Sequence, residues 1–436
     1  MHFVVHPSRL TGATVTVPGD KSISHRALML SSIADGTSTV SNFLNGEDCL
    51  ATSAAMQAMG VRIDVPEANT LRVHGTGLAG LRAPQGPLEL GNSGTGMRLL
   101  AGLLAGQPFD STLTGDASLT RRPMRRVIEP LARMGARIVG RDGLPPLTIH
   151  GGQRLARIDY PLPVASAQVK SAILLASLYA TGQCRITEPA TTRDHTERML
   201  AGMGIDMEFG DGEVRLRGST RLRATDITVP GDLSSAAFVI LATLIARRGE
   251  TLIRNVGINP TRTGILDILL QMGADIRLEK HRLAGNEPVA DIRVAASELR
   301  GIEVDPGLVS LAIDEFPALF VAAAVASGRT RFSGIGELRV KESDRIGAMV
   351  AGLHSLGIRV EESPDGAVVQ GGRLQGGTVQ SFGDHRVAMS FAVAATVAQG
   401  AITVRDVDAV NTSFPGFDDC LRELGVEISS TEHCPT

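Results

Sequence analysis

A helix-like apolar run, a glycine and a β-branched stretch follow one another six times along the chain. The segments "LLAGLLAGQPFDSTL" and "LFVAAAVASGRTRF" are two of the copies. The six glycines are Gly36, Gly106, Gly182, Gly249, Gly328 and Gly400, at nearly even spacing. A glycine in this place is typical of the left-handed residue that closes a helix. Repeats of this kind predict a fold made from one supersecondary unit used six times.

A second series of helix, glycine and strand lies between the copies of the first. Its glycines are Gly60, Gly135, Gly204, Gly273, Gly357 and Gly425, each following a glycine of the first series at a similar interval. Helices of this series keep charged residues such as Arg133 and Glu423, which predicts one face in water, whereas the first series is apolar nearly all round and predicts burial. Each unit is therefore about 70 residues with two helices and several strands, one helix buried.

A chain of 436 residues is too long for one ordinary core, so two domains of three units each are expected. The corner "VTVPGDKSIS" around Gly19 returns as "ITVPGDLSSA" around Gly231, which is three units further on. We interpret the two corners as paired crossovers near 17–20 and 229–232. The predicted first domain is 20–229, and the second is 1–19 plus 230–436. The fold class is α/β, with three buried parallel helices in each domain.

Composition and charge exclude several classes of protein. A net charge of −3 gives no reason to expect nucleic acid or a membrane as partner. Four cysteines stand far apart without metal-binding spacing, which argues against disulfides and structural zinc: Cys49, Cys184, Cys420 and Cys434. The N-terminus lacks a signal pattern, and the longest apolar runs are about half a bilayer span. The sequence predicts a cytoplasmic protein.

Each apolar helix begins at a short polar segment. In the first half these segments hold Lys21, Ser22 and Arg26, then Asn92, Ser93, Gly94, Thr95 and Arg98, then Ser166, Gln168 and Lys170. In the second half they hold Asp232, Ser234 and Ser235, then Asp314 and Glu315, then Asp384, His385 and Arg386. Parallel helices would open their N-termini together, and backbone N–H groups there bind anions. Two such ends facing each other would enclose a cleft for ligands with several anionic groups.

Simpler roles exist for many of these residues. Ser, Asp and Asn at helix starts commonly only cap the helix, which we expect for Asp232, Ser234 and Ser235. His385 is expected to be structural. Lys21 and Arg26 differ, because a cation at a helix N-terminus opposes the dipole unless an anion is present.

Two connecting segments carry further charge. "GDASLTRRPMRRV" supplies Arg121, Arg122, Arg125 and Arg126, and "RVKESDRI" supplies Arg339, Lys341, Glu342, Asp344 and Arg345. Arginine offers forked donors that suit carboxylate and phosphate. Arg125 and Arg126 are expected to be solvated surface charge. For "KESDR", surface ion pairs and a proton-carrying carboxylate among cations are both open interpretations.

At this point the sequence resembles a known family. "PGDKSISHRA", "GNSGTGMRL", "GDASLTRRPM", "SAQVKSAILLA", "TRDHTE", "RVKESDRI", "DHRVAMSF" and "TSFPGF" are similar to signature segments of the 5-enolpyruvylshikimate-3-phosphate synthases, in family order and over nearly the whole chain. The resemblance implies two hemispherical domains of three βαβαββ units each, an inverted α/β barrel. It implies transfer of the enolpyruvyl group of phosphoenolpyruvate to the 5-hydroxyl of shikimate-3-phosphate, by addition and elimination, in aromatic amino-acid and chorismate biosynthesis. No metal or organic cofactor is implied, and a monomer is expected.

The resemblance also implies residue roles. Shikimate-3-phosphate would be held by Lys21, Ser22, Arg26, Ser166, Ala167, Gln168, Arg193, Asp314 and Lys341. Phosphoenolpyruvate would be held by Lys21, Asn92, Gly94, Thr95, Arg122, Gln168, Glu342, Arg345 and Arg386. Asp314 would take the proton from the attacking hydroxyl. Glu342 and Lys21 would protonate the methylene carbon and assist the departing phosphate.

Three positions bear on how the family pattern applies here. Many members have a lysine where this chain has Thr412, so one phosphate contact is missing or comes from elsewhere. Ala167 replaces a second serine, so a contact there uses the backbone. Members tolerant of the herbicide glyphosate tend to carry alanine where this chain has Gly94. We therefore expect glyphosate to compete with phosphoenolpyruvate, and Gly94→Ala to weaken the inhibitor.

Two other functions are weighed against this one. The sister enzyme that transfers enolpyruvyl to UDP-N-acetylglucosamine usually has a cysteine in the loop corresponding to Gly115–Arg122, where this chain has none. A non-catalytic anion-binding or nucleotide-binding module is the other alternative. No GxGxxG follows a predicted strand, and no GxxxxGK[ST] is present.

Overall fold

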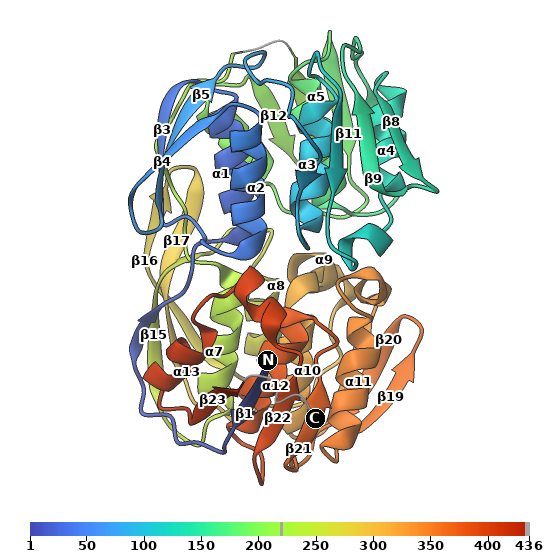
Figure 1. The fold of residues 1–436 in the computed structure, drawn as a ribbon. Coiled ribbons are helices and arrows are strands. Elements are labelled where there is room, and N and C mark those ends of the chain that lie inside the picture. Colours follow the sequence, from blue (N-terminus) through green and yellow to red (C-terminus); the bar gives the residue numbers. More distant parts are fainter. Residues whose placement is uncertain (219–220, 432–436) are drawn as a thin grey trace. The chain divides into compact units, whose positions relative to one another are not determined.

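A computed structural model describes residues 1–218 and 221–431 of the chain (Figure 1). Cys434, one of the four cysteines considered above, lies outside these residues. The chain divides into two compact units. The first domain comprises 19–229 together with 283–287, and the second comprises 1–18, 230–282 and 288–436. The segment 283–287 is an excursion that the sequence analysis did not include.

The first domain has two kinds of helix. Its helices are α1 (Lys21–Ser32), α2 (Glu47–Ala58), α3 (Gly94–Leu104), α4 (Arg125–Arg133), α5 (Ala167–Ser177) and α6 (His195–Gly202), with a 3₁₀ turn η1 (Leu119–Arg121). In α3, nine of the eleven residues are buried, whereas α4 buries only Val127, Pro130 and Leu131. The two series of helices in the sequence predict this contrast, because a helix that is apolar on every face is stabilised on all of them only when it is buried in a core.

Three four-stranded sheets complete the first domain. Their strands are β3 (Asp35–Ser41), β4 (Arg62–Glu67), β5 (Thr70–Thr76), β6 (Leu88–Glu89), β7 (Ser111–Thr114), β8 (Arg137–Arg141), β9 (Leu144–His150), β10 (Asp159–Pro161), β11 (Gln183–Thr187), β12 (Met207–Gly210), β13 (Glu213–Arg217) and β14 (Ile227–Thr228). The strand orders are β14-β3-β5-β4, β6-β7-β9-β8 and β10-β11-β13-β12. Each sheet has one parallel pair and two antiparallel pairs, so one unit is built three times.

The second domain repeats this plan. Its helices are α7 (Leu233–Ile245), α8 (Gly264–Gln271), α9 (Val309–Ala312), α10 (Phe316–Val325), α11 (Arg345–Ser355), α12 (His385–Ala395) and α13 (Phe417–Glu423). Its 3₁₀ turns are η2 (Pro306–Leu308), η3 (Ile313–Glu315), η4 (Gly336–Val340) and η5 (Asp408–Thr412). Its strands are β1 (His2–Val5), β2 (Thr14–Thr16), β15 (Glu250–Gly257), β16 (Asp275–Ala284), β17 (Glu287–Ala295), β18 (Arg329–Ser333), β19 (Arg359–Ser363), β20 (Gly366–Gln370), β21 (Gly377–Gln380), β22 (Ile402–Arg405) and β23 (Ile428–Thr431).

The N-terminal strands complete units that the C-terminal half leaves open. The sheets are ordered β16-β17-β15-β2, β18-β20-β19 and β21-β22-β1-β23. β1 pairs antiparallel with both β22 and β23, and β2 runs parallel to β15. The last unit therefore takes one of its two inner strands from the start of the chain, which ties the two ends of the sequence into one domain.

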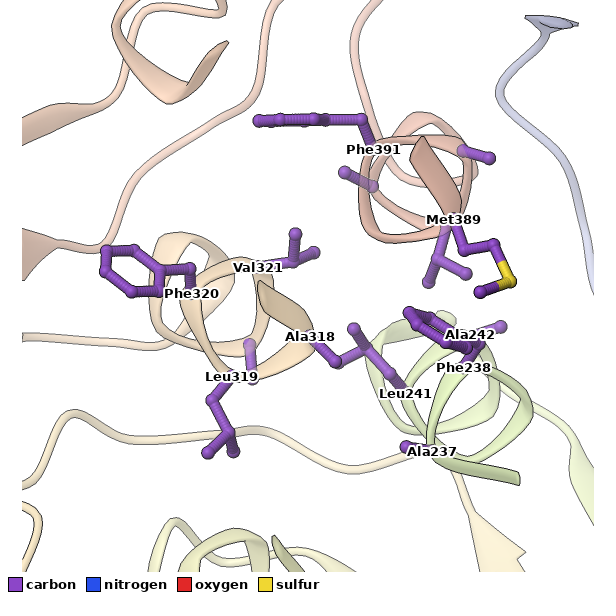
Figure 2. Close-up of a cluster of buried hydrophobic side chains, with 14 of the residues drawn as sticks. Ala237, Phe238, Leu241, Ala242, Ala318, Leu319, Phe320, Val321, Met389 and Phe391 are labelled. Carbon is purple, nitrogen blue, oxygen red and sulfur yellow. The ribbon is translucent and has the colours of Figure 1, made fainter. Parts of the chain in front are cut away.

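Three apolar helices form the core of the second domain. α7, α10 and α12 pack pairwise against one another, and all eleven residues of α12 are buried. In Figure 2, Val321 of α10 and Leu241 of α7 point into the space between these helices, and Met389 reaches from α12 toward Phe238 of α7. Burial of one such large side chain contributes about 1.5–3 kcal/mol. The stretch Pro306–Val325 is long and apolar enough to cross a membrane by composition, but it is 67% buried, as a core helix is.

The predicted helix-closing glycines behave in two ways. All six glycines of the second series have φ between +82° and +103°, so they are the left-handed residues expected. In the first series the expectation is wrong at Gly106 and Gly400, which are not left-handed. A Cβ at Gly106 would lie 2.2 Å from Cγ of Tyr179. Glycine is needed there for close packing rather than for a backbone angle.

The tip of the β16–β17 hairpin, 283–287, belongs to the first domain. Nδ2 of Asn286 donates to the carbonyl of Arg198 at 2.9 Å, and Nη1 of Arg198 donates to the carbonyl of Asn286 at 3.1 Å. Nδ1 of His195 lies 2.8 Å from Oε1 of Glu287, and both side chains are buried. The chain thus enters the first domain a second time, through a hairpin whose sequence carries no VPGD corner.

Candidate active site

The charged corner begins α1 of the first domain. The Asp20 side chain accepts a hydrogen bond from the backbone N–H of Ile23 at 2.8 Å and caps the helix. Nζ of Lys21 lies 2.7 Å from Oδ2 of Asp48, which α2 provides. The anion expected beside Lys21 is thus present as a carboxylate of the protein itself.

Arg26, one turn further along α1, is the centre of a buried polar network. Its Nε donates to Oγ1 of Thr196 and its Nη2 to Oγ of Ser171, each at 2.7 Å. Its Nη1 donates to the carbonyl of Ser22 at 2.8 Å, and Nη1 of Arg193 donates to Oγ of Ser22 at 3.3 Å. Burial, with Arg193 nearby, lowers the pKa of Arg26 to about 10. Two guanidinium groups therefore converge on Ser22, an arrangement suited to an anion.

His25 connects three helices next to this network. Its Nδ1 is 2.9 Å from Oγ1 of Thr52, and its Nε2 is 3.4 Å from Oγ of Ser93, the N-cap of α3. Burial, together with Lys21 and Arg26, lowers the pKa of His25 to about 3. The ring is therefore a neutral spacer between α1, α2 and α3.

The starts of α3 and α5 meet through side-chain hydrogen bonds. Nε2 of Gln168 donates to Oγ1 of Thr95 at 2.9 Å, while Oε1 of Gln168 accepts from Nη1 of Arg98 at 2.6 Å. Arg122 is buried, and its guanidinium donates to both the side chain and the backbone carbonyl of Asn92. The predicted ligand residues of this region therefore form two hydrogen-bonded pairs, Thr95 with Gln168 and Asn92 with Arg122. Arg98, which also bonds to Gln168, was not among the predicted ligand residues.

Two further predicted residues begin α5. Ser166 is the N-cap, and its Oγ accepts from the backbone N–H of Val169 at 3.4 Å. Ala167 is the first residue of the helix, so only its backbone can contact a ligand. Gly94 is likewise the first residue of α3. These positions present backbone N–H groups at the positive ends of two buried helices.

In the second domain the predicted residues gather around Arg345. Its Nε donates to Oδ2 of Asp384 and its Nη2 to Oε2 of Glu342, each at 2.7 Å, and Oδ1 of Asp314 is 3.3 Å from Nη1. Nζ of Lys341 is 3.7 Å from the same Asp314 oxygen. Burial by itself lowers the pKa of Arg345, but Asp384, Glu342 and Asp314 outweigh it and hold the pKa above its ordinary value. Arg345 is buried and Glu342 is partly exposed, whereas Asp344 is exposed and pairs with Arg339. The interpretation as surface pairs therefore fails for Arg345 and holds for Asp344.

Arg386 begins α12 beside a second buried carboxylate. The side chain of Asp384 caps this helix by accepting from the backbone N–H of Arg386 at 2.9 Å. Nη1 of Arg386 is 3.7 Å from Oε1 of Glu315, which also lies 3.5 Å from Nη2 of Arg262. The Asp384 side chain therefore contacts two predicted ligand arginines, at the guanidinium of Arg345 and at the backbone N–H of Arg386.

The uncharged copy of the corner does more than cap its helix. Asp232 caps α7 by accepting from the backbone N–H of Ser234 at 2.9 Å, as expected. Ser234 also donates to Glu315 and accepts from Nη2 of Arg262 at 2.7 Å. The expectation that Ser234 only caps is wrong, because a distant arginine replaces the cations that α1 carries itself.

Thr412 and the cysteines have local roles. Oγ1 of Thr412 donates to the carbonyl of Ala409 at 2.7 Å within η5, so this hydroxyl already has a partner. Cys49, Cys184 and Cys420 are free thiols in buried positions. Among the described residues no group of three His, Cys, Asp or Glu side chains is placed to hold a metal ion.

Comparison with known proteins shows the family to which the chain belongs. The sequence profile of EPSP synthase (3-phosphoshikimate 1-carboxyvinyltransferase) matches residues 4–421. The 3-phosphoshikimate 1-carboxyvinyltransferase of Xanthomonas campestris pv. campestris (strain B100) is 55% identical over 430 residues, which is 98% of each chain. That of Xanthomonas oryzae pv. oryzae (strain PXO99A) is 54% identical over 432 residues, 99% of this chain and 98% of its own. The EPSP synthase structure from Acinetobacter baumannii matches with a TM-score of 0.88 and 48% identity, covering 98% of this chain and 100% of that one.

These matches place the chain in the class of carboxyvinyl transferases with a mixed α/β fold. Within that class the chain belongs to the EPSP synthase family. The fold class and the family indicated by the sequence motifs are both confirmed.

Proposed function

We propose that this chain transfers the enolpyruvyl group of phosphoenolpyruvate to the 5-hydroxyl of shikimate-3-phosphate and releases phosphate. The observation that carries the proposal is the cluster around Arg345. One buried guanidinium orients two carboxylates, Asp314 and Glu342, which can accept and donate protons at one site. Family membership gives this cluster its reaction, because the named relatives are 3-phosphoshikimate 1-carboxyvinyltransferases.

Shikimate-3-phosphate is assigned to the residues that the family motifs imply for it. The converging guanidinium groups of Arg26 and Arg193, with Ser22 between them, suit its phosphate. The complete set is Lys21, Ser22, Arg26, Ser166, Ala167, Gln168, Arg193, Asp314 and Lys341. Because Ala167 has no side-chain donor, its contribution is the backbone N–H at the start of α5.

Phosphoenolpyruvate is assigned to a second group of cations, which shares Lys21 with the first. Arg122, fixed by Asn92, and Arg345, fixed by three carboxylates, offer forked donors for its carboxylate and phosphate. The complete set is Lys21, Asn92, Gly94, Thr95, Arg122, Gln168, Glu342, Arg345 and Arg386. Two polyanions repel each other in water, so fixed cations and helix dipoles supply much of the catalytic stabilisation.

The reaction then proceeds by addition and elimination. Asp314 takes the proton of the 5-hydroxyl of shikimate-3-phosphate while the hydroxyl oxygen forms a bond to C2 of phosphoenolpyruvate. At the same time C3 of phosphoenolpyruvate gains a proton from Glu342 or Lys21. The bond between C2 and the phosphate oxygen then breaks, and C3 returns a proton as the double bond re-forms. Phosphate leaves beside the cations that bound it, which stabilise its charge.

We further propose that glyphosate competes with phosphoenolpyruvate, because Gly94 leaves the start of α3 without a side chain next to Arg98 and Arg122. A cytoplasmic monomer, expected from the sequence, stays a prediction.

A phosphate-release assay with phosphoenolpyruvate as donor tests the proposal. Wild-type protein is expected to release phosphate with shikimate-3-phosphate as acceptor and not with UDP-N-acetylglucosamine; the reverse pattern would sink it. Asp314→Asn is expected to lower kcat by about 10²–10⁴. Asp275→Asn, the same change at an exposed surface ion pair, is the matched control and is expected to leave kcat unchanged. A wild-type kcat in Asp314→Asn would remove Asp314 as the base.

A further inference from the structure

A buried cluster of three charged side chains lies directly beneath the Arg26 network in the first domain. Lys170 of α5 is 1% exposed, and its Nζ lies 2.8 Å from Oε1 of Glu188 and 2.7 Å from Oε1 of Glu197. The carbonyl of Thr192 accepts from the same Nζ at 3.5 Å. Both glutamates are at most 5% exposed. None of these residues belongs to the ligand sets assigned above.

Stability by itself is a poor explanation for such a cluster. Buried ion pairs cost so much desolvation that well-packed apolar residues of similar volume are often equally or more stable. Burial lowers the pKa of Lys170, but Glu197 and Glu188 outweigh it and raise the pKa overall, so the ammonium stays charged. Burial raises the pKa of Glu197 although Lys170 opposes this shift, so keeping this carboxyl group beside Lys170 carries a desolvation cost.

The cluster touches the site through its neighbours in sequence. Ser171 follows Lys170 and Thr196 precedes Glu197, and these two hydroxyls are the acceptors for Nη2 and Nε of Arg26. The hydroxyls are also hydrogen-bonded to each other at 2.8 Å. Fixing α5 to α6 through the Lys170–Glu197 ion pair therefore fixes the direction in which the Arg26 guanidinium points.

The same cluster anchors the segment that carries Arg193. Glu188 stands at one end of this segment, bound to Lys170, and its other oxygen accepts a hydrogen bond from the hydroxyl of Thr192. Arg193 comes next in the chain and reaches Ser22 at 3.3 Å. The attraction of Glu197 for Arg26 also opposes the repulsion between Arg26 and Arg193.

We propose that Lys170, Glu188 and Glu197 are positioning residues that hold Arg26 and Arg193 in a phosphate-ready arrangement before the acceptor binds. The inference rests on the proposed assignment of these arginines to shikimate-3-phosphate. It concerns the acceptor, because the two arginines that the cluster orients, Arg26 and Arg193, are assigned to shikimate-3-phosphate and not to phosphoenolpyruvate.

Glu188→Gln and Glu197→Gln test the proposal in the full-length chain, because each keeps the side-chain shape and removes one negative charge. We expect the dissociation constant of shikimate-3-phosphate, measured by calorimetry without phosphoenolpyruvate, to rise about tenfold. The KM of shikimate-3-phosphate should rise in parallel, while the KM of phosphoenolpyruvate changes less than about twofold. Glu213→Gln, the same change at the more exposed Arg185–Glu213 pair of this domain, is the matched control and should alter neither constant.

The outcomes separate this inference from the proposed function. If wild-type protein does not bind shikimate-3-phosphate, the proposed function fails. If wild-type protein binds it and folded glutamine variants bind it equally well, or if both KM values rise together, the positioning role fails. Should the glutamine variants not fold, Thr192→Val decides: it removes only the hydroxyl that braces Glu188, and a selective rise of about threefold supports the role. An unchanged acceptor constant in that variant overturns it.

Discussion

Replacement of His25 should change how the stability of the first domain depends on pH. The ring is fully buried between Thr52 and Ser93, and its pKa is about 3 instead of the ordinary 6.5. The folded state therefore binds fewer protons than the unfolded state between these two values. The contribution of neutral His25 to the free energy of unfolding is fully present above pH 6.5 and is lost as the pH falls toward 3. Each pH unit in this window changes the free energy of unfolding by about 1.36 kcal/mol. Lowering the pH from 7.5 to 5 should therefore reduce it by about 2 kcal/mol, because only the part below pH 6.5 counts.

His25→Gln removes this titration while it keeps one donor and one acceptor. The chain has no tryptophan, and its two tyrosines, Tyr160 and Tyr179, both lie in the first domain, so tyrosine fluorescence reports unfolding of that domain. Urea unfolding at pH 7.5 and pH 5 gives the pH-dependent loss for each protein. The wild-type loss should exceed the variant loss by about 2 kcal/mol, with all other titrating groups cancelling. Losses equal within about 0.5 kcal/mol would show that His25 is not held neutral in the folded protein.

Three further substitutions test the site and its framework. A Cβ at Gly94 would lie 2.9 Å from Nη1 of Arg98 and 3.1 Å from Nη1 of Arg122, so in Gly94→Ala these flexible ends should shift. Both the KM of phosphoenolpyruvate and the inhibition constant of glyphosate should then rise. Equal inhibition constants in wild type and variant would contradict this. Arg122→Lys keeps the charge but loses the fork, and steady-state kinetics should show about a tenfold higher KM for phosphoenolpyruvate with that of shikimate-3-phosphate unchanged. A Cβ at Gly102 would lie 2.1 Å from the backbone oxygen of Ala172, which cannot move aside as a side chain can. Gly102→Ala should therefore lower the free energy of unfolding, measured by tyrosine fluorescence, by about 1–3 kcal/mol. An unchanged unfolding midpoint would show that α3 and α5 pack less closely than described.

Sequence patterns identified many residues of the candidate site but few of their partners. Lys21 and Arg26 stand out because cations at a helix start conflict with a local rule, and such conflicts mark functional positions. Asp48, which pairs with Lys21, sits in the acidic first turn of another helix and looks like ordinary dipole compensation. Glu197, on a different helix from Lys170, carries no signal that it will be its ion-pair partner. Partner choice depends on helix packing, which a local pattern does not contain.

The sequence by itself determined the repeating unit, its two kinds of helix and the corners at Pro18 and Pro230, because hydrophobic period and glycine positions act over short stretches of chain. Tertiary structure decided which strands complete which sheet, including the insertion of β1 between β22 and β23 at the far end of the chain. It also decided that Gly106 is required by the ring of Tyr179 and not by its own backbone angle. These outcomes depend on pairing and packing between segments far apart in the sequence, where the free energy comes from burial shared by both partners.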